Sequence, residues 1–334
     1  TNSMSKKFFF FFSAVCLMGA FTACDDEDNA NDLNALSRTY EGKSIELKMG
    51  EVTLPNSGKS VVLNAAAADK AQLTLNNILP ENSSLTLDAS LASTGDTYTF
   101  NGEGTTTDGT VTVNGTVKGG LLSLSFQRKV THPVASTWQL APGAAAVTAE
   151  IATGMPQIDA MAPMVGPLLG NLIAQKVSTV TLTLAESGIF GVAWQKIDAT
   201  EPVSINQYTE MFSIQYCVKE GAYYLCIDKN YVEVLGQVLT QFAGDKMAEL
   251  GIDFQQILAL FTDLGGYYGL ALNMEVTDNQ VLFTADKSLL LPVINALYPL
   301  ISQKVPEAYQ PLVNQLMQML PNAQALNLGL RFVK

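Results

Sequence analysis

The stretch Thr110–Phe126, TVTVNGTVKGGLLSLSF, decides the fold of the first half of this chain. Apolar and polar residues alternate in its two runs, which is the period of a β-strand with one buried and one solvated face. Gly119-Gly120 separates the runs and provides turn residues. The stretch therefore predicts two neighbouring antiparallel strands.

Short alternating runs of the same kind extend outward from this stretch, back to about residue 40. Clusters of Gly, Asn, Asp and Pro separate them at intervals of about ten residues, a spacing typical of an antiparallel sandwich or barrel. Thr and Ser dominate the outward positions, as expected for a solvated sheet face. We predict an all-β domain over residues 38–130. Its other predicted strands are Lys43–Lys48, Ser60–Asn64, Gln72–Leu75, Ser84–Ser90 and Thr97–Phe100.

Residues 131–156 are rich in Ala, Pro and Gly and mark the boundary to a second domain. We expect them to hold a linker and the first strand of that domain, around Trp138. From residue 157 the pattern mixes helix and strand periods, which predicts an α+β domain over residues 157–334 with helices inserted between strands.

The elements of this second domain follow from the period of each run. In the helix predicted over 158–176, Pro163 and Pro167 are expected to break or delay the first part. The other predicted helices are Tyr231–Leu250, Phe254–Leu264, Leu289–Gln303 and Tyr309–Leu320. The predicted strands are Thr179–Leu184, Ile189–Trp194, Met211–Val218, Tyr223–Ile227, Tyr268–Val276, Val281–Thr284 and Leu326–Val333.

The first residues carry the features of a secretory signal. Lys6 and Lys7 precede an apolar run, Phe8–Ala23, that ends at Cys24. A basic start, a short apolar core and a small residue before the cut describe a signal peptide, here residues 1–23. The run is shorter than the roughly 20 residues that a membrane-spanning helix needs. A cleaved signal is therefore favoured over an uncleaved anchor helix.

The end of this segment, Phe21-Thr22-Ala23-Cys24, resembles a lipobox. The resemblance implies that Cys24 becomes the first mature residue and carries acyl chains, which hold a protein stably on a membrane when there are two or more. The acidic run Asp25–Asp28 resembles the export signal of surface lipoproteins in Bacteroidetes-type bacteria. It also fits a solvated tether, here residues 24–37. We expect an outer-membrane lipoprotein at the cell surface, with a periplasm-facing position as the alternative.

Composition restricts the class of partner. The chain has 334 residues, with 19 basic and 31 acidic side chains and a net charge of −12. A chain this acidic is repelled by phosphate backbones, which argues against nucleic acid as a partner. The length fits two domains of roughly 150 residues each.

Two segments add a resemblance to known β domains. Leu36–Gly42 resembles the opening of calycin-like domains in Bacteroidetes lipoproteins, and Ser136–Leu140, with Trp138, resembles the start of a lipocalin-like domain. The whole layout is similar to a family of uncharacterised lipoproteins from gut Bacteroidetes. It implies an α+β chain: a calycin-like antiparallel barrel or sandwich, then a lipocalin-like β-meander with inserted helices. That family carries no established activity.

Two cysteines remain in the predicted body of the protein, Cys217 and Cys226. An exported chain meets an oxidising environment, so the two could form a disulfide. A hairpin that turns at Gly221-Ala222 would place them directly opposite each other. A turn at Glu220-Gly221 would place them out of register, as two reduced thiols.

Catalytic patterns are not evident in the sequence. The single histidine, His132, lies beside Pro133 in the predicted linker, where we expect a solvated side chain. One histidine supports neither a histidine metal site nor more than one general base. Paired carboxylates could serve a glycosidase, but we expect the acids at element ends to be caps and turn residues. These acids are Asp228, Asp263, Asp278 and Asp286. We predict no catalytic, metal or cofactor residue.

The predicted helices near the C-terminus are apolar on nearly every side. Such helices are buried on several sides or meet lipid. They suggest an apolar pocket, with a well-packed core as the alternative. The pocket residues would be Leu290, Ile294, Leu297, Leu316 and Met317.

These observations favour a noncatalytic, lipid-anchored binding protein of the cell envelope, whose ligand is hydrophobic or a glycan. One alternative is a carrier of a hydrophobic small molecule that uses the second domain. The others are a hydrolase acting on surface glycans and an adhesion module.

Overall fold

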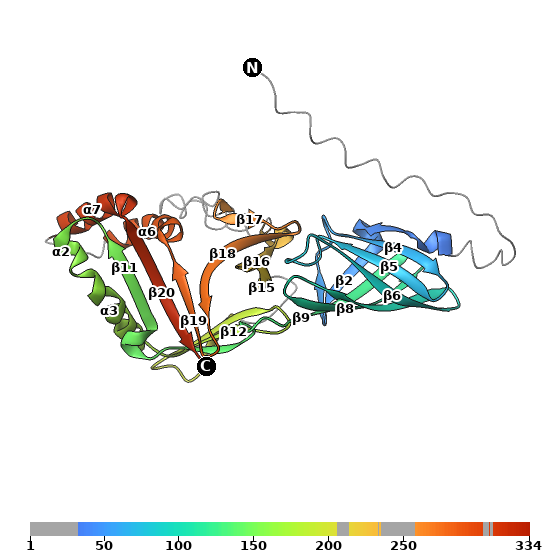
Figure 1. Cartoon of the computed structure of the whole chain (residues 1–334), viewed down its shortest axis with the longest axis horizontal. Helices are drawn as coiled ribbons and strands as arrows, with labels where there is room; N and C mark the ends of the chain where they lie inside the picture. The colour runs from blue at the N-terminus through green and yellow to red at the C-terminus, as the bar shows by residue number, and fades with distance from the viewer. Residues whose placement is uncertain (1–32, 206–213, 233, 235–257, 303–306, 308–309) are drawn as a thin grey trace, which may run out of the picture.

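The computed structural model describes residues 33–205, 214–232, 234, 258–302, 307 and 310–334. The described chain is mainly β and forms two curled sheets that follow one another along the molecule (Figure 1). The first sheet ends at Val130 and the second begins at Ser136. The predicted signal, Cys24 and most of the predicted helix over 231–250 lie outside the described residues.

The first sheet has nine strands, in the order β1-β4-β5-β6-β7-β8-β9-β2-β3. The predicted strands of the 110–126 stretch belong to β8 and β9, which pair from Gly109↔Val130 to Lys118↔Leu121 and turn at Gly119-Gly120. The strands are β1 Arg38–Glu41, β2 Ile45–Met49, β3 Val52–Leu54, β4 Ser60–Ala67, β5 Lys70–Asn76, β6 Ser84–Thr94, β7 Thr97–Thr105, β8 Gly109–Lys118 and β9 Leu121–Val130.

The first sheet curls because consecutive segments of chain lie at its opposite ends. β1 pairs with β4, while β2 pairs in parallel with β9, and only the short helix η1 (Gly42–Ser44) separates β1 from β2. The inward side chains form one buried cluster inside this half-barrel. Leu36 belongs to that cluster, and its carbonyl accepts a hydrogen bond from the Tyr40 hydroxyl at 2.9 Å. The predicted tether over 24–37 is therefore wrong at its C-terminal end, which is part of the folded body.

The second sheet has eleven strands and is a meander that returns on itself. β12 pairs with β13, β16 joins β15 to β18, and β19 joins β18 to β20. β10 pairs with both β12 and β20, and a bridge from Ile189 to Gln215 links the start of β13 to β15. The strands are β10 Ser136–Leu140, β11 Val147–Ala152, β12 Val177–Leu184, β13 Phe190–Lys196, β14 Val203–Ile205, β15 Ile214–Lys219, β16 Ala222–Asp228, β17 Phe261–Asp263, β18 Tyr267–Val276, β19 Gln280–Ala285 and β20 Ala325–Val333.

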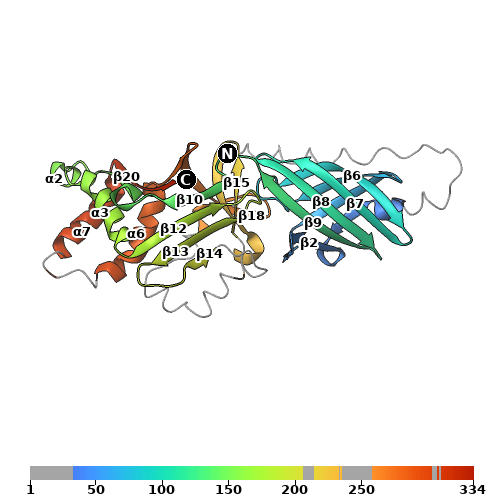
Figure 2. The same cartoon turned by 90° about the horizontal axis from the view of Figure 1, so that it is seen from below.

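The described helices of eight or more residues lie at the end of the second sheet that is remote from the first sheet (Figures 1 and 2). They are α3 (Ala162–Ala174), α6 (Lys287–Ser302) and α7 (Gln310–Met319), with the short α2 (Pro156–Asp159) before α3. α6 and α7 coincide closely with two predicted helices. The helix predicted over 254–264 is wrong at its end, because β17 (Phe261–Asp263) pairs with β18 across the Gly265-Gly266 turn.

Helix α3 buries its small residues instead of its large ones. Ala162 and two glycines, Gly166 and Gly170, face η2 (Gly143–Ala146) and β11. A Cβ atom on Gly170 would overlap the carbonyl oxygen of Gly143, so the helix and this segment touch backbone to backbone. Three large apolar side chains of the helix, Val165, Leu169 and Ile173, are half-buried. Four others, in the helix and at its N-cap, are between 47% and 70% exposed. They are Met161, Met164, Leu168 and Leu172.

Candidate functional site

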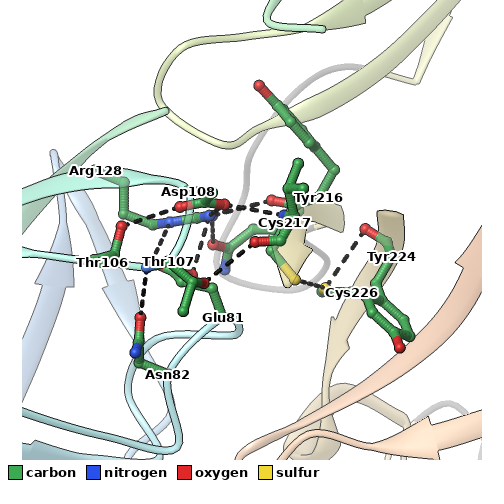
Figure 3. A network of polar contacts seen from close by, with 12 residues as sticks. Glu81, Asn82, Thr106, Thr107, Asp108, Arg128, Tyr216, Cys217, Tyr224 and Cys226 are labelled. Atoms are coloured by element: carbon green, nitrogen blue, oxygen red, sulfur yellow. Dashed lines mark hydrogen bonds and ion pairs between the residues drawn. The ribbon is translucent and has the colours of Figure 1, made fainter. Parts of the chain in front are cut away.

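A buried arginine joins the two sheets. Arg128, near the end of β9, donates from Nε to Glu81 Oε1 and from Nη2 to Asp108 Oδ2, each at 3.1 Å (Figure 3). It also donates from Nη1 to Gln215 Oε1 at 3.1 Å and from both terminal nitrogens to the Tyr216 carbonyl. Glu81 and Asp108 come from loops of the first sheet, whereas Gln215 and Tyr216 lie on β15. We call Arg128, Glu81, Asp108 and Gln215 the Arg128 cluster.

The charges of this cluster are withdrawn from solvent. The side chains of Arg128, Glu81 and Asp108 are each at most 1% exposed. Burial raises the pKa of Glu81, and the nearby Arg128 charge opposes that rise. Burial also lowers the pKa of Arg128, but the two carboxylates more than offset this effect and keep the guanidinium charged. Buried charges of this kind are strongly destabilising once a partner is lost.

A second buried pair crosses between the sheets. Lys59 Nζ, beside β4, lies 2.6 Å from Asp228 Oδ2 at the end of β16, and their side chains are 0% and 2% exposed. Asp228 also accepts a hydrogen bond from the backbone N–H of Asn230, as the predicted capping role requires. The Tyr267 hydroxyl donates to the carbonyl of Ile78 at 2.8 Å. The ion-pair role of Asp228 could not be predicted from the sequence, because its partner Lys59 is 169 residues away in the chain.

A pair of thiols lies directly behind the Arg128 cluster. In the β15–β16 hairpin Lys219 is opposite Ala222, so the turn is Glu220-Gly221. Cys217 is opposite Tyr224 rather than Cys226, which is the out-of-register alternative of the sequence analysis. The two sulfurs nevertheless lie 3.2 Å apart, unbonded and fully buried, because diagonal neighbours share one face of the sheet. A disulfide between them stays a prediction.

These thiols are tied to the cluster by the backbone of β15 (Figure 3). The residues on either side of Cys217 both bond to the Arg128 cluster. The Tyr216 carbonyl accepts a hydrogen bond from Arg128, and the Val218 N–H donates to Asp108 Oδ2 at 3.1 Å. Burial raises the pKa of the Cys226 thiol well above its ordinary value. The Cys226 thiol is therefore protonated, and the pair is a buried part of the contact between the sheets.

His132 is half-buried, so the expectation of a solvated linker side chain is wrong. Its ring packs edge-to-face on Tyr223 with 5.4 Å between ring centroids, and its Nδ1 accepts from the Val134 N–H at 3.3 Å. Burial lowers the pKa of His132, which favours the neutral imidazole. These contacts give the histidine a packing role at the start of the second sheet.

The apolar interior of the second sheet is closed at the end that holds Trp138. At the closed end Trp138 is fully buried, its Nε1 donates to the Val134 carbonyl at 3.1 Å, and Lys334 Nζ lies 4.8 Å from the centre of its ring. Along β20 the exposed fraction then rises from 6% at Phe332 to 37% at Leu330, and it returns to 6% at Leu326.

The neighbouring strands repeat this change. On β12 Leu182 and Leu184 are buried and Val180 is half-buried, and on β19 Val281 is buried and Phe283 half-buried. We call the open end the apolar mouth. Its residues are Leu140, Val180, Met274, Phe283 and Leu330.

A hollow of about 270 Å³ adjoins this mouth, between α3 and the ends of β10 and β12. Two mouth residues, Leu140 and Val180, line it together with Ile173 and Gly170 of α3. The close backbone contact of α3 with η2 sets the position of this wall.

The predicted pocket on α6 and α7 is described only in part. Leu290 and Ile294 on α6 and Met317 on α7 are half-buried, while the side chains of Leu297 and Leu316 lie outside the described residues. None of the three described side chains lines the 270 Å³ hollow. The α6–α7 pocket stays a prediction.

The acids proposed from sequence have partners of their own. Asp286 accepts from the backbone N–H of Ser288 and of Leu289 and thus caps α6. Asp263 accepts from Lys229 Nζ at 2.6 Å and from the Gly265 N–H. Both are cap or turn residues, as predicted.

Comparison with known proteins supplies no family for this chain. Searches against protein-family models, curated proteins and solved structures found no match. Among the described residues, no helix combines the length and the apolar character needed to cross a membrane. The functional argument therefore depends on the geometry of the chain itself.

Proposed function

We propose that the protein is a noncatalytic binding protein of the cell envelope, held at the outer membrane by acyl chains on Cys24. The second sheet is its ligand-binding part, and the ligand is a hydrophobic small molecule. The first sheet is the platform between the anchor and this binding part, since the chain enters it directly after the acidic tether.

The apolar mouth carries this proposal. Leu330, Phe283 and Val180 point toward the inside of the second sheet but keep contact with solvent. Apolar surface left in water forgoes about 25 cal/mol for each Å² that burial would gain. A concave apolar site with few polar groups is the usual form of a small-molecule site. The hollow of about 270 Å³ beside the mouth can hold part of such a molecule.

The strand order supports a lipocalin-like second sheet and a calycin-like first sheet. In the second sheet, strands that are close in the sequence pair in turn and the last strand, β20, pairs with the first, β10. Trp138 on that first strand fills the closed end. A meander closed at one end and open at the other is a shape that holds one small ligand.

The buried acids favour binding over glycan hydrolysis. A glycosidase needs two carboxyl groups that reach the substrate from either side. Glu81 and Asp108 share one arginine, but both are buried and hydrogen-bonded to it. Both acids therefore belong to the contact between the sheets and are not accessible to a substrate.

A neutral fluorescent probe tests the binding function. We expect N-phenyl-1-naphthylamine to brighten in the presence of the purified full chain, and Leu330→Asp to weaken its binding at least tenfold. Thr112→Asp adds the same charge on the outer face of the first sheet and should leave binding unchanged. No brightening with folded wild-type protein, or an equal loss in both variants, would refute the apolar site.

Labelled palmitate tests the anchor separately. We expect cells that express the chain to incorporate the label, and Cys24→Ser to abolish incorporation. Equal labelling of the variant and the wild type would exclude acylation at this cysteine. Protease treatment of intact cells then distinguishes a surface position from a periplasm-facing one.

A further inference from the structure

A second hollow, of about 420 Å³, lies at the rim of the apolar mouth. Its wall contains two lysines, Lys176 and Lys196, and the half-buried Trp194. The remaining lining residues are Val177, Asp198 and Ala199. This site differs from the mouth in carrying charge.

The two hollows form one continuous surface. Val177 lines both of them. In the β12–β13 ladder Val180 is directly opposite Trp194, and Val177 is directly opposite Lys196. Residues that are directly opposite in a ladder point to the same face of the sheet. The indole of Trp194 and the stem of Lys196 therefore continue the apolar face that begins at Val180.

The charge of the second hollow is positive, against the trend of the chain. Two lysines and one acid, Asp198, line it, whereas the whole protein has a net charge of −12. Three described lysines form ion pairs: Lys59 with Asp228, Lys118 with Asp96 and Lys229 with Asp263. Within the described part of the chain, no ion pair involves Lys176 or Lys196. Both ammonium groups are exposed and free to meet an anion.

We infer that the ligand of the second sheet is an amphipathic anion, with an apolar chain in the mouth and an anionic head group between Lys176 and Lys196. Ammonium groups form charge-assisted hydrogen bonds with carboxylate or phosphate oxygens. Trp194 lies where the head joins the chain, a position suited to an indole because one face can be apolar while its N–H stays near water. This inference rests on the proposed function and names the class of its ligand.

The test compares two molecules that differ only in the head group. Displacement of N-phenyl-1-naphthylamine is measured with dodecanoate and with 1-dodecanol, both below the concentration at which they aggregate. We expect dodecanoate to bind about tenfold more tightly at low salt, since each exposed ion pair contributes up to about 1 kcal/mol. Added salt should reduce this preference.

Charge variants then locate the head group. The double substitution Lys176→Gln/Lys196→Gln should remove the preference for dodecanoate and leave 1-dodecanol binding unchanged. Lys43→Gln/Lys70→Gln, an equal change of charge on the first sheet, should preserve the preference. An equal loss in both double variants would show a diffuse field instead of a site, and would overturn the inference.

The possible failures are distinguishable. If both molecules bind equally to the wild type, the anionic head is refuted while the apolar site stands. If neither binds, the proposed function itself fails. Binding to vesicles of anionic phospholipid without binding of soluble dodecanoate would identify a membrane contact, and would overturn the inference of a single bound amphiphile.

Discussion

The two sheets of this protein use the same alternating pattern with opposite results. Inward residues of the first sheet, such as Val113, Leu124 and Phe126, are at most 1% exposed. In the second sheet some corresponding residues are only half-buried or exposed, as Leu330 on β20, Val180 on β12 and Phe283 on β19. A close-packed interior has no space for a ligand. In an interior that is incompletely filled, a bound apolar ligand would bury exposed apolar side chains, which is favourable. This difference supports the proposed division into a platform, the first sheet, and a binding part, the second sheet.

The contact between the sheets differs from both interiors, because it contains buried charged side chains. Its charges lie on Arg128, Lys59, Glu81, Asp108 and Asp228. A buried polar contact requires a fixed geometry, since every group needs its partner. It therefore fixes how the second sheet sits on the first sheet.

Loss of Arg128 should lower the free energy of unfolding more than any other change proposed here, because it removes a buried contact between the two sheets. Arg128→Met leaves Glu81 and Asp108 buried without their cation, which should lower the free energy of unfolding by about 3–5 kcal/mol. Urea unfolding measures this change. Arg38→Met is the matched control, because Arg38 is exposed, and it should cost less than about 1 kcal/mol. Similar losses in the two variants would contradict the role of the cluster.

Oxidation of the thiol pair should stabilise the β15–β16 hairpin, which is the part of the second sheet that contacts the first sheet. With oxidised glutathione as the electron acceptor, Cys217 and Cys226 would give up two protons and two electrons and form one S–S bond. We expect this bond to raise the free energy of unfolding by about 2–3 kcal/mol, as for other short loops. Cys217→Ser/Cys226→Ser should not respond to the oxidant.

Alkylation of the unfolded protein, followed by mass spectrometry, gives the redox state directly. After oxidation, neither residue should be alkylated until a reductant is added. Complete alkylation of both thiols in the oxidised sample would exclude the disulfide.

The strands of the first sheet were predictable because their alternation is regular and their turns contain Gly, Asn and Asp. The Arg128 cluster left one signal in the sequence: Arg128 continues the inward phase of Leu122, Leu124 and Phe126, where a charge is out of place. Its partners could not be found, because Asp108 is 20 residues away and Gln215 is 87 away. Only the folded chain brings them together.

The second sheet was less predictable for local reasons. Glu220-Gly221 and Gly221-Ala222 are both acceptable turns, so the cysteine register stayed open until the pairing was known. The strand β17 follows a helix-like apolar pattern, and Gly265-Gly266, the turn that makes it a hairpin, lies just after it. Lys176 and Lys196, which line the second hollow, come from different strand ends, and the β12–β13 ladder brings them together.

Truncation of matched valines measures how completely each interior is filled. Val113→Ala, in the first sheet, removes fully buried methyl groups and should cost about 2 kcal/mol of unfolding free energy. Val180→Ala, in the mouth, removes half-buried ones and should cost about half as much. Urea unfolding of the two variants tests the difference. Equal costs would mean that the second interior is as well packed as the first.

On α3, substitution of a glycine should lower the free energy of unfolding more than truncation of a leucine, although a leucine truncation is usually the more destabilising change. Gly170→Ala would normally favour a helix by about 1 kcal/mol. Here its Cβ would overlap the Gly143 carbonyl oxygen, so the helix must shift, at a net cost of about 1–2 kcal/mol. Leu172→Ala removes a side chain that is 47% exposed and should cost less than about 0.5 kcal/mol.

The same pair of variants relates packing to binding. The Gly170→Ala shift moves one wall of the 270 Å³ hollow, since Gly170 and Ile173 both line it. Binding of N-phenyl-1-naphthylamine should therefore weaken in Gly170→Ala, and it should change little in Leu172→Ala because Leu172 is outside the lining. If Leu172→Ala proved the more destabilising variant, α3 would be packed through its large side chains. The open mouth would then be closed by this helix, and the contrast between the two interiors would disappear.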